Sequence, residues 1–329
     1  MTSLAPILQK FFTDWLCVQK SVSENTLVSY RDAIRMLVEF VCREKNVAPV
    51  KLNVEAIDAE MVGRFLANVE TNRRNCARTR NARLSAIRSF FSYVAISDPA
   101  LMLQCQRILA MPSKRYDRPS LAYLEQPEIE CLLAAPDRST WMGRRDYALL
   151  LLGLETGLRV SELTGLEKCH VVTGANAHVS CVGKGRKERA TPLKKATAGV
   201  MARWLEECSG DAHSPVFATR QGTKLSRDAV ADIVNKHCLA ASSRCSSLAA
   251  KRVTPHTLRH SAAMTLLHCG VDPSVVALWL GHERLETTQI YVHADLKLKQ
   301  RALARVGENE RGLSTFKPTD SLMAFLKGL

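Results

Sequence analysis

A short basic stretch containing two prolines separates two differently patterned regions of this 329-residue chain. Residues 106–122 hold these prolines and four basic side chains, which is typical of an extended cationic linker between domains. Before the stretch, apolar residues recur at helical spacing; after it, helical segments are interrupted by one alternating segment. We therefore predict a boundary near residue 115, with four parts: a helical domain at 1–105, a linker at 106–122, a second domain at 123–310 and a tail at 311–329.

The apolar spacing predicts a mainly α-helical fold with a small β-hairpin. In the first domain, helices are expected at 4–19, 23–41, 58–66 and 78–94. In the second domain, helices are expected at 126–134, 144–154, 161–166, 196–208, 226–238, 254–269 and 273–280. Residues 178–193 alternate around a Gly-Lys-Gly-Arg turn and predict the hairpin, whereas the small and polar residues 240–251 predict a loose loop.

The chain carries 46 Lys and Arg against 32 Asp and Glu, which gives a formal net charge of +14. Such an excess favours a polyanionic partner, with nucleic acid ahead of an anionic membrane surface. Six of these charges lie close together before and within the fourth expected helix: Arg73, Arg74, Arg78, Arg80, Arg83 and Arg88. Positions 71–90 contain no acidic residue, and like charges repel, so we expect this segment to contact phosphates rather than to be an ordinary solvated face.

Several classes of protein are disfavoured by the sequence. The chain has no run of about eighteen apolar residues, so no transmembrane span is expected, and its N-terminus does not resemble a signal peptide. The eleven cysteines are scattered singly, without a C-x-x-C pair. They predict reduced, buried thiols rather than a disulfide framework or a zinc site, and hence a cytoplasmic protein.

The segment Thr254-Pro-His-Thr-Leu-Arg-His260 admits three interpretations. Thr254 followed by proline fits the start of a helix, so His256 would lie in the first turn, where free N–H groups and the helix dipole favour a phosphate. Arg259 would lie on the same face, with a planar fork suited to phosphate. The alternatives are a core helix with ordinary histidines and a zinc site. The zinc site is disfavoured because Thr257 stands where a zinc protease has its glutamate.

Four further residues are candidates for chemistry, each with a structural alternative. Arg159 has Glu162 three positions on, which could hold its guanidinium, although a purely structural ion pair would look the same. Lys184 lies between two glycines at the expected hairpin tip, where it could donate a proton or be a solvated turn lysine. His282 follows a helix stop, and Tyr291 comes nine residues later, where a packed tyrosine is more common than a nucleophile.

Taken together and in this order, these motifs resemble the tyrosine recombinase (phage integrase) family. The resemblance rests on Thr-Gly-Leu-Arg159-Val-Ser-Glu-Leu, Gly-Lys184-Gly-Arg-Lys-Glu-Arg, His256-Thr-Leu-Arg259-His-Ser, Leu-Gly-His282 and Thr-x-x-x-Tyr291. It covers about residues 120–300 and extends more weakly into the first domain, which is similar to the core-binding domain of Xer-type members. Each motif alone is weak, whereas all five in order are highly specific.

The resemblance implies a two-domain clamp around duplex DNA, with a SAM-like helical core-binding domain and a mixed α+β catalytic domain. It implies that Tyr291 attacks a scissile phosphate, forming a 3′-phosphotyrosine and freeing a 5′-hydroxyl. Arg159 and Arg259 would stabilise the phosphate charge that grows in the transition state. His256 would act as general base or proton shuttle, and Lys184 would protonate the leaving oxygen.

The remaining implied roles concern binding and assembly. His282 would bond the phosphate, Glu162 would orient Arg159 or His256, and Arg186 and Lys187 would contact DNA together with the six arginines named above. No cofactor and no metal are expected, because two arginines and a lysine can replace a metal. The implied partners are double-stranded DNA and further recombinase subunits, as a homo-tetramer or a hetero-tetramer with a related recombinase, in the nucleoid of a bacterial cytoplasm and without a membrane.

The residues leave the biological role open. Integration or transposition of a mobile element is favoured, with an Xer-type chromosome or plasmid dimer resolvase as the alternative. A type IB topoisomerase-like enzyme shares the same chemistry and would relax supercoils as a monomer. A non-catalytic accessory DNA-binding factor would not need Tyr291. The tail at 311–329 would dock on its own domain or, as the resemblance suggests, be donated to a neighbouring protomer.

Overall fold

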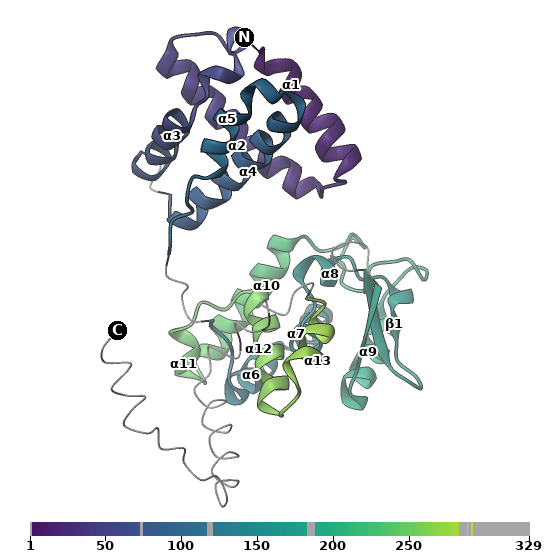
Figure 1. The fold of residues 1–329 in the computed structure, drawn as a ribbon. Helices are drawn as coiled ribbons and strands as arrows, with labels where there is room; N and C mark the ends of the chain where they lie inside the picture. Colours follow the sequence, from purple (N-terminus) through teal and green to yellow (C-terminus); the bar gives the residue numbers. More distant parts are fainter. Residues whose placement is uncertain are drawn as a thin grey trace, which may run out of the picture. The chain divides into compact units, whose positions relative to one another are not determined.

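The computed structural model describes residues 2–72, 75–116, 121–182 and 188–282, together with Thr288 and Tyr291. The chain divides into two compact units, Met1–Arg118 and Pro119–Leu329 (Figure 1). None of the described helices is long and apolar enough to cross a membrane. The expected tail at 311–329 lies outside the described residues.

The first unit is a bundle of helices around one apolar core. Its α-helices are α1 (Leu4–Lys10), α2 (Glu24–Lys45), α3 (Ala59–Thr71), α4 (Ala77–Ser97) and α5 (Met102–Leu109). A π-helix, Phe11–Gln19, continues α1, and 3-10 turns lie at Pro49–Lys51, Val54–Ala56 and Pro99–Leu101. Phe11, Phe65, Phe90 and Phe91 are fully buried and join these helices in the core. Helix starts follow their caps, because Ser23 and Asp58 accept hydrogen bonds from backbone N–H groups of the first turn.

The second unit combines helices with a small sheet. Its helices are α6 (Gln126–Leu133), α7 (Trp141–Thr156), α8 (Val160–Thr164), α9 (Lys195–Glu207), α10 (Arg227–Ser242), α11 (Ser246–Ala249), α12 (Pro255–His268) and α13 (Pro273–Leu280), with a 3-10 turn at Lys168–His170. The strands β1 (Val171–Val172), β2 (His178–Val182) and β3 (Glu188–Pro192) form an antiparallel sheet in the order β1-β2-β3. The mainly helical fold with a small hairpin sheet is therefore confirmed.

Three details of the prediction are wrong. The expected loose loop at 240–251 is mostly helical, since α10 continues to Ser242 and α11 follows; Leu248 is buried and anchors the segment. Helix α5 continues to Leu109, past the expected start of the linker at residue 106, because the side chain of Ile108 is buried in the core. The cysteines are all free, but only three of the eleven are buried.

Two helices that each end at a glycine position the arginines of the candidate site. Helix α7 ends at Gly157, whose φ is +64°, and α13 ends at Gly281, whose φ is +65°. A Cβ atom on Gly157 would lie 2.5 Å from Leu280 Cδ2, so this close approach requires glycine. Both glycines present backbone carbonyl oxygens to the guanidinium groups described next.

Candidate active site

Two arginines are held by backbone carbonyls at these helix ends. Arg259, in the first half of α12, is 5% exposed and donates from Nη1 to Gly157 O at 2.6 Å and from Nη2 to Leu280 O at 2.7 Å. Arg159, immediately before α8, donates from Nη2 to Gly281 O at 2.9 Å. A guanidinium has five N–H donors, so each arginine keeps donors for a phosphate.

A buried carboxylate connects one of these arginines to the sheet. Glu162 Oε1 accepts from Arg159 Nη1 at 2.9 Å, and its Oε2 accepts from the Arg159 backbone N–H at 2.7 Å. Arg189, on β3, donates to both oxygens of Glu162, at 3.0 and 2.8 Å. Burial disfavours the ionised carboxylate, but the hydrogen bonds from Arg189 and Arg159 outweigh it and hold the pKa of Glu162 below its ordinary value.

The expected contact between Arg159 and Glu162 is thus present in the structure. Arg189 was missed as part of this contact, because the sequence showed it only as one of several positive charges on the hairpin. Its partner Glu162 is 27 residues away in the sequence, and only the folded chain brings the two side chains together.

The tyrosine lies against a row of histidines. Tyr291 is 3% exposed, and its hydroxyl oxygen is 2.9 Å from His260 Nδ1. The His282 ring stacks on Tyr291 at a centroid distance of 6.2 Å, and the rings of His256 and His260 are 6.3 Å apart. His282 Nδ1 is also within hydrogen-bond distance, 2.8 Å, of Thr288 Oγ1. The ring that contacts the tyrosine hydroxyl is therefore that of His260, four residues after the histidine expected to act as base.

His260 was overlooked although it stands inside the quoted motif. It lies next to Arg259 in sequence, and two histidines four apart on a helix gave no reason to choose the second. What distinguishes His260 is its contact with Tyr291, 31 positions later. A spacing of that kind carries no helical or strand periodicity.

The electrostatics of this cluster follow from burial beside two guanidinium groups. Burial, together with neighbouring positive charges, lowers the pKa of His260 and of His282 to about 4, so both rings are neutral at pH 7. His256 is more exposed, and partial desolvation of its ring together with Arg259 and Arg159 lowers its pKa. Burial and the nearby Arg159 lower the pKa of Arg259 to about 10, which leaves it protonated at pH 7.

Tyr291 is subject to two opposing effects. Burial raises the pKa of the Tyr291 phenol, whereas Arg259 and Arg159 lower it, and burial is the larger effect. The phenol is therefore protonated at neutral pH and needs a proton acceptor to become a nucleophile. His260 is neutral and within hydrogen-bond distance, so its Nδ1 can accept that proton.

The start of α12 has the geometry expected of an anion site. Thr254 is the N-cap, its hydroxyl accepts from Thr257 N, and proline follows at the first helical position. His256 thus lies in the first turn, on the helix that also carries Arg259 and His260. Neutral histidines and two cations around a helix N-terminus suit a phosphate diester better than a metal ion.

The structure describes only part of the predicted DNA-contacting set. Lys184, Arg186 and Lys187 on the hairpin, and Arg73 and Arg74 before α4, lie outside the described residues. Four arginines on α4 are described: Arg78, Arg80, Arg83 and Arg88.

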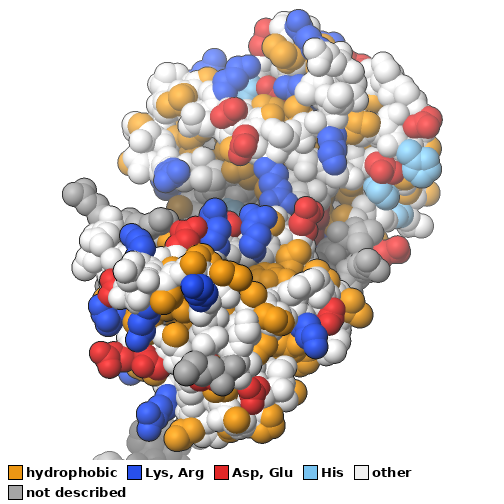
Figure 2. Space-filling view, turned by 90° about the horizontal axis from the view of Figure 1, so that it is seen from above, with side chains coloured by type: hydrophobic (Ala, Val, Ile, Leu, Met, Phe, Trp, Pro, Cys, Tyr) orange, Lys and Arg blue, Asp and Glu red, His pale blue; other side chains and the backbone are white. Residues whose placement is uncertain are grey.

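These four arginines of α4 differ in exposure. Arg78 is exposed, and Arg83 is half-buried. Arg80 Nε lies 3.7 Å from Glu70 Oε2, and Arg88 donates a hydrogen bond to the backbone oxygen of Met111. In the face seen in Figure 2, blue Lys and Arg side chains lie among red acidic and orange apolar ones. The expectation of a segment without counter-charges is therefore wrong for Arg80, because Glu70 lies one position before the acid-free residues 71–90.

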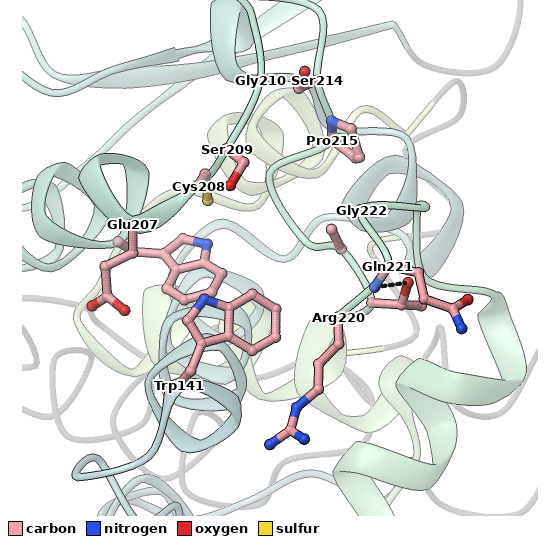
Figure 3. Close-up of a pocket in the computed structure, with 13 residues that line it drawn as sticks. Trp141, Glu207, Cys208, Ser209, Gly210, Ser214, Pro215, Arg220, Gln221 and Gly222 are labelled. Carbon is pink, nitrogen blue, oxygen red and sulfur yellow. Dashed lines mark hydrogen bonds between the residues drawn. The ribbon is translucent and has the colours of Figure 1, made fainter.

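A cavity of about 630 Å³ lies elsewhere in the second unit (Figure 3). The cavity is lined by Trp141 and Trp204, whose ring centroids are 5.3 Å apart, and by residues of the chain between Glu207 and Gly222. None of its lining residues belongs to the tyrosine cluster.

Comparison with known proteins decides the family. Residues 122–297 match the phage integrase family, and residues 9–96 match the phage integrase N-terminal SAM-like domain. The chain belongs to the phage integrase family. It is therefore a tyrosine recombinase, a member of the class of enzymes that cleave and rejoin DNA.

Relatives by sequence cover nearly the whole recombinase. The chain is 47% identical over 327 residues to a protein of Sinorhizobium fredii named as an integrase/recombinase, y4rC, with 99% of this chain and 98% of the relative covered. It is 30% identical to the tyrosine recombinase XerC of Pelobacter propionicus, with 89% and 93% covered. It is 31% identical to the tyrosine recombinase XerD of Pseudomonas aeruginosa, with 88% and 92% covered.

Solved structures bear on the fold. The recombinase resembles the XerH site-specific recombinase bound to a palindromic difH substrate, with a TM-score of 0.66, 21% identity, and 84% of this chain and 79% of that chain covered. It also resembles the Tn1549 transposon integrase in complex with a circular intermediate DNA, with a TM-score of 0.68, 16% identity, and 93% and 99% covered. At these identities, the likeness supports the two-domain recombinase fold alone.

Proposed function

We propose that this recombinase cuts and rejoins DNA of a mobile element through a covalent bond between Tyr291 and a 3′-phosphate. The observation that carries the proposal is the buried Tyr291 hydroxyl, 2.9 Å from His260 Nδ1. The same cluster contains the guanidinium groups of Arg159 and Arg259, which act on the charge of the Tyr291 phenol. A binding protein would not need a phenol with a proton acceptor beside it, so the arrangement supports catalysis.

In the proposed first step, the Tyr291 oxygen forms a bond to the scissile phosphorus as its proton passes to His260. The bond from phosphorus to the 5′-oxygen breaks, and Lys184 supplies the proton that this oxygen needs. Arg159 and Arg259 donate hydrogen bonds to the non-bridging oxygens, where negative charge grows. The number of phosphate ester bonds is unchanged, so the step needs no external energy source.

In the second step, a 5′-hydroxyl from a partner strand attacks the phosphotyrosine. The new phosphodiester forms, the bond to Tyr291 breaks, and the phenol regains its proton. His256 and His282 would donate hydrogen bonds to phosphate oxygens from a neutral ring N–H. The position of His256 in the first turn of α12 and the stacking of His282 on Tyr291 support these roles. Glu162 acts through Arg159, which it contacts directly.

We also propose DNA partners and an assembly. The formal charge of +14, with Arg78 exposed on α4, supports contacts to phosphates of double-stranded DNA. Two strand exchanges need four active tyrosines, which supports a tetramer on DNA, of this chain alone or with a related recombinase. In that assembly, residues 311–329 would reach a neighbouring protomer. The bacterial relatives support an enzyme that acts on the DNA of a bacterial cytoplasm.

The mobile-element role rests on the degree of similarity to the relatives. Identity to the integrase/recombinase of Sinorhizobium fredii is 47%, against about 30% for the Xer recombinases. A resolvase of chromosome or plasmid dimers is the second candidate, because the Xer similarity also spans both domains. The DNA that the enzyme recombines distinguishes the two.

The experiment places candidate sites on a supercoiled plasmid, taken either from the DNA flanking the gene or from the replication-terminus region. Purified enzyme that deletes or inverts the segment between two flanking sites supports the mobile-element role, whereas recombination only at terminus sites supports the resolvase. Relaxation of plasmid without any such site, and without exchange, would instead indicate a topoisomerase. The proposed catalysis would be contradicted if the enzyme, at stoichiometric concentration, bound both plasmids without changing the topology of either DNA.

A further inference from the structure

A second group of polar side chains lies on the second unit, apart from the tyrosine cluster. Glu167, Cys169 and His213 place a carboxylate oxygen, a sulfur and an imidazole nitrogen within 4.8 Å of one another. Among the described residues, no other group of three such side chains comes this close. Glu167 and Cys169 lie at the 3-10 turn Lys168–His170, and His213 lies in the loop that follows α9.

The distances within the group are near those of a metal site. Glu167 Oε2 is 2.9 Å from His213 Nδ1 and 3.7 Å from Cys169 Sγ, and Sγ is 4.0 Å from Nδ1. A tetrahedral zinc site places nitrogen and oxygen ligands about 3.3 Å apart, and sulfur about 3.6 Å from either. Each separation is within about half an ångström of its target, which small side-chain rotations can supply.

The two segments that carry these side chains are fixed to each other by the backbone. The contacts are Lys168 N to Ser214 O at 3.0 Å, Cys169 N to Ala212 O at 2.8 Å, and an antiparallel bridge between Glu167 and Pro215. Asp211 Oδ1 also accepts from His213 N at 3.1 Å and so holds the loop that carries the imidazole. The ligand atoms therefore start close together, and metal binding would not have to order a free loop.

We propose that Glu167, Cys169 and His213 bind one zinc ion, with water as the fourth ligand. A thiolate with an imidazole and a single carboxylate favours zinc over magnesium or calcium, which prefer sets of oxygen ligands. Cys169 loses its thiol proton to solvent when its sulfur binds the ion. The nearby carboxylate of Asp211 adds negative charge, and the Lys168 ammonium is turned to the carbonyl oxygens of Cys208 and Gly210.

The proposed ion would join the turn at residues 167–169 to the loop that lines one side of the cavity in Figure 3. Ser209, Gly210, Ser214 and Pro215 line that cavity, and His213 belongs to the same loop. The ligands come from positions 44 residues apart, so no C-x-x-C pair marks the site. This is why the spacing of the cysteines argued against zinc. The role is structural and independent of the reaction at Tyr291.

The test is a titration of reduced, metal-free full-length protein with Co²⁺ and then Zn²⁺. We expect each chain to bind one metal ion tightly. Cobalt should give a thiolate-to-cobalt charge-transfer band, and zinc should raise the melting temperature. Cys169→Ser should remove the band, and Cys169→Ser and His213→Ala should each weaken zinc binding about tenfold or more. Cys17→Ser and Cys269→Ser, also at exposed cysteines, are matched controls that should bind as the unaltered protein does.

Two results would overturn the site. One is a charge-transfer band that persists in Cys169→Ser, since another thiol would then be the ligand. The other is an unaltered protein that binds no zinc at stoichiometric concentration. All substituted side chains are exposed, and the melting temperatures without metal serve to check folding. Because no DNA is present, the result does not depend on the proposed recombination.

Discussion

The reactivity of Tyr291 is set by its immediate neighbours. Burial raises its pKa, Arg259 and Arg159 lower it, and His260 lies at hydrogen-bond distance from the hydroxyl. The sequence indicated the tyrosine and both arginines, because their order along the chain is the family's. It could not indicate which of the two histidines on α12 contacts the tyrosine, because that depends on where the folded chain places Tyr291 relative to α12.

His260 is the first residue to test. His260→Ala removes the proton acceptor beside Tyr291, and we expect the single-turnover rate of DNA cleavage to fall about 100-fold. His178→Gln, at an exposed hydrogen bond to Asn176 O, is the control and should leave the rate unchanged. DNA affinity, measured in parallel by fluorescence anisotropy, should change less than about threefold. A cleavage rate within twofold of the unaltered enzyme would show that His260 does not take the proton.

The half-buried His260 also makes stability depend on pH. The pKa of His260 is about 4 in the folded protein against 6.5 ordinarily, so below pH 6.5 the unfolded chain binds a proton that the folded chain does not. The free energy of unfolding should therefore fall as the pH decreases from 6.5 towards 4. Urea denaturation at pH 7 and pH 5 measures this.

The comparison variant for this effect is His260→Gln, which does not titrate. Its loss of stability between pH 7 and pH 5 should be smaller than that of the unaltered protein. An equal loss in both proteins would mean that His260 is protonated in the folded state as readily as in the unfolded state.

At the scale of elements, α8 and β3 are joined through Glu162. The carboxylate is buried and accepts from Arg159 and Arg189, so loss of one guanidinium leaves a buried charge with half its partners. We expect Arg189→Met to lower the free energy of unfolding by about 3 kcal/mol. Cleavage should also slow, because Arg159 would lose its fixed orientation.

The matched variants for this link are Arg189→Lys and the double variant Arg189→Met with Glu162→Gln. The lysine restores one charge-assisted bond and should recover part of both losses. The double variant removes the unpaired charge, so the free energy of unfolding should recover toward the unaltered value more completely than the cleavage rate does. Equal recovery of stability and of cleavage in the double variant would contradict a role of Glu162 in orienting Arg159.

Gly157 is a second element-scale constraint. Its φ is +64°, its Cβ position is filled by Leu280, and its carbonyl accepts from Arg259. Gly157→Ala should cost about 1–3 kcal/mol of stability and displace the Arg259 guanidinium. Gly199→Ala in α9, where nothing lies within 4 Å of an added Cβ, is the control and should not destabilise. Equal unfolding free energies for the two variants would contradict this account.

The elements themselves were predictable to different degrees. Long helices with regular apolar spacing, such as α2, α10 and α12, were found within a few residues of their ends. Residues 240–251 were expected to be a loose loop because they are small and polar. Helix α11 forms there because Leu248 is buried against the core of the unit, and a single apolar residue carries no periodicity.

At the scale of the whole molecule, the charge of +14 implies a salt-dependent affinity for DNA. We expect Arg78→Ala, at an exposed position, to reduce the slope of log affinity against log salt by about one. Arg88→Ala should leave the slope nearly unchanged and instead lower the melting temperature, because Arg88 donates to Met111 O. Binding isotherms at several salt concentrations measure both. Equal slopes for the unaltered protein and Arg78→Ala would remove this residue from the DNA interface.

The central claim is that Tyr291 becomes covalently joined to DNA. The measurement uses a nicked duplex library with randomised arms, in which cleavage releases a short fragment and leaves the protein attached. The adduct is digested and the linked peptide is identified by mass spectrometry. We expect a 3′-phosphonucleotide on the peptide that contains Tyr291, and no adduct with Tyr291→Phe at equal DNA binding. An adduct at another residue, or one that persists in Tyr291→Phe, would contradict the account.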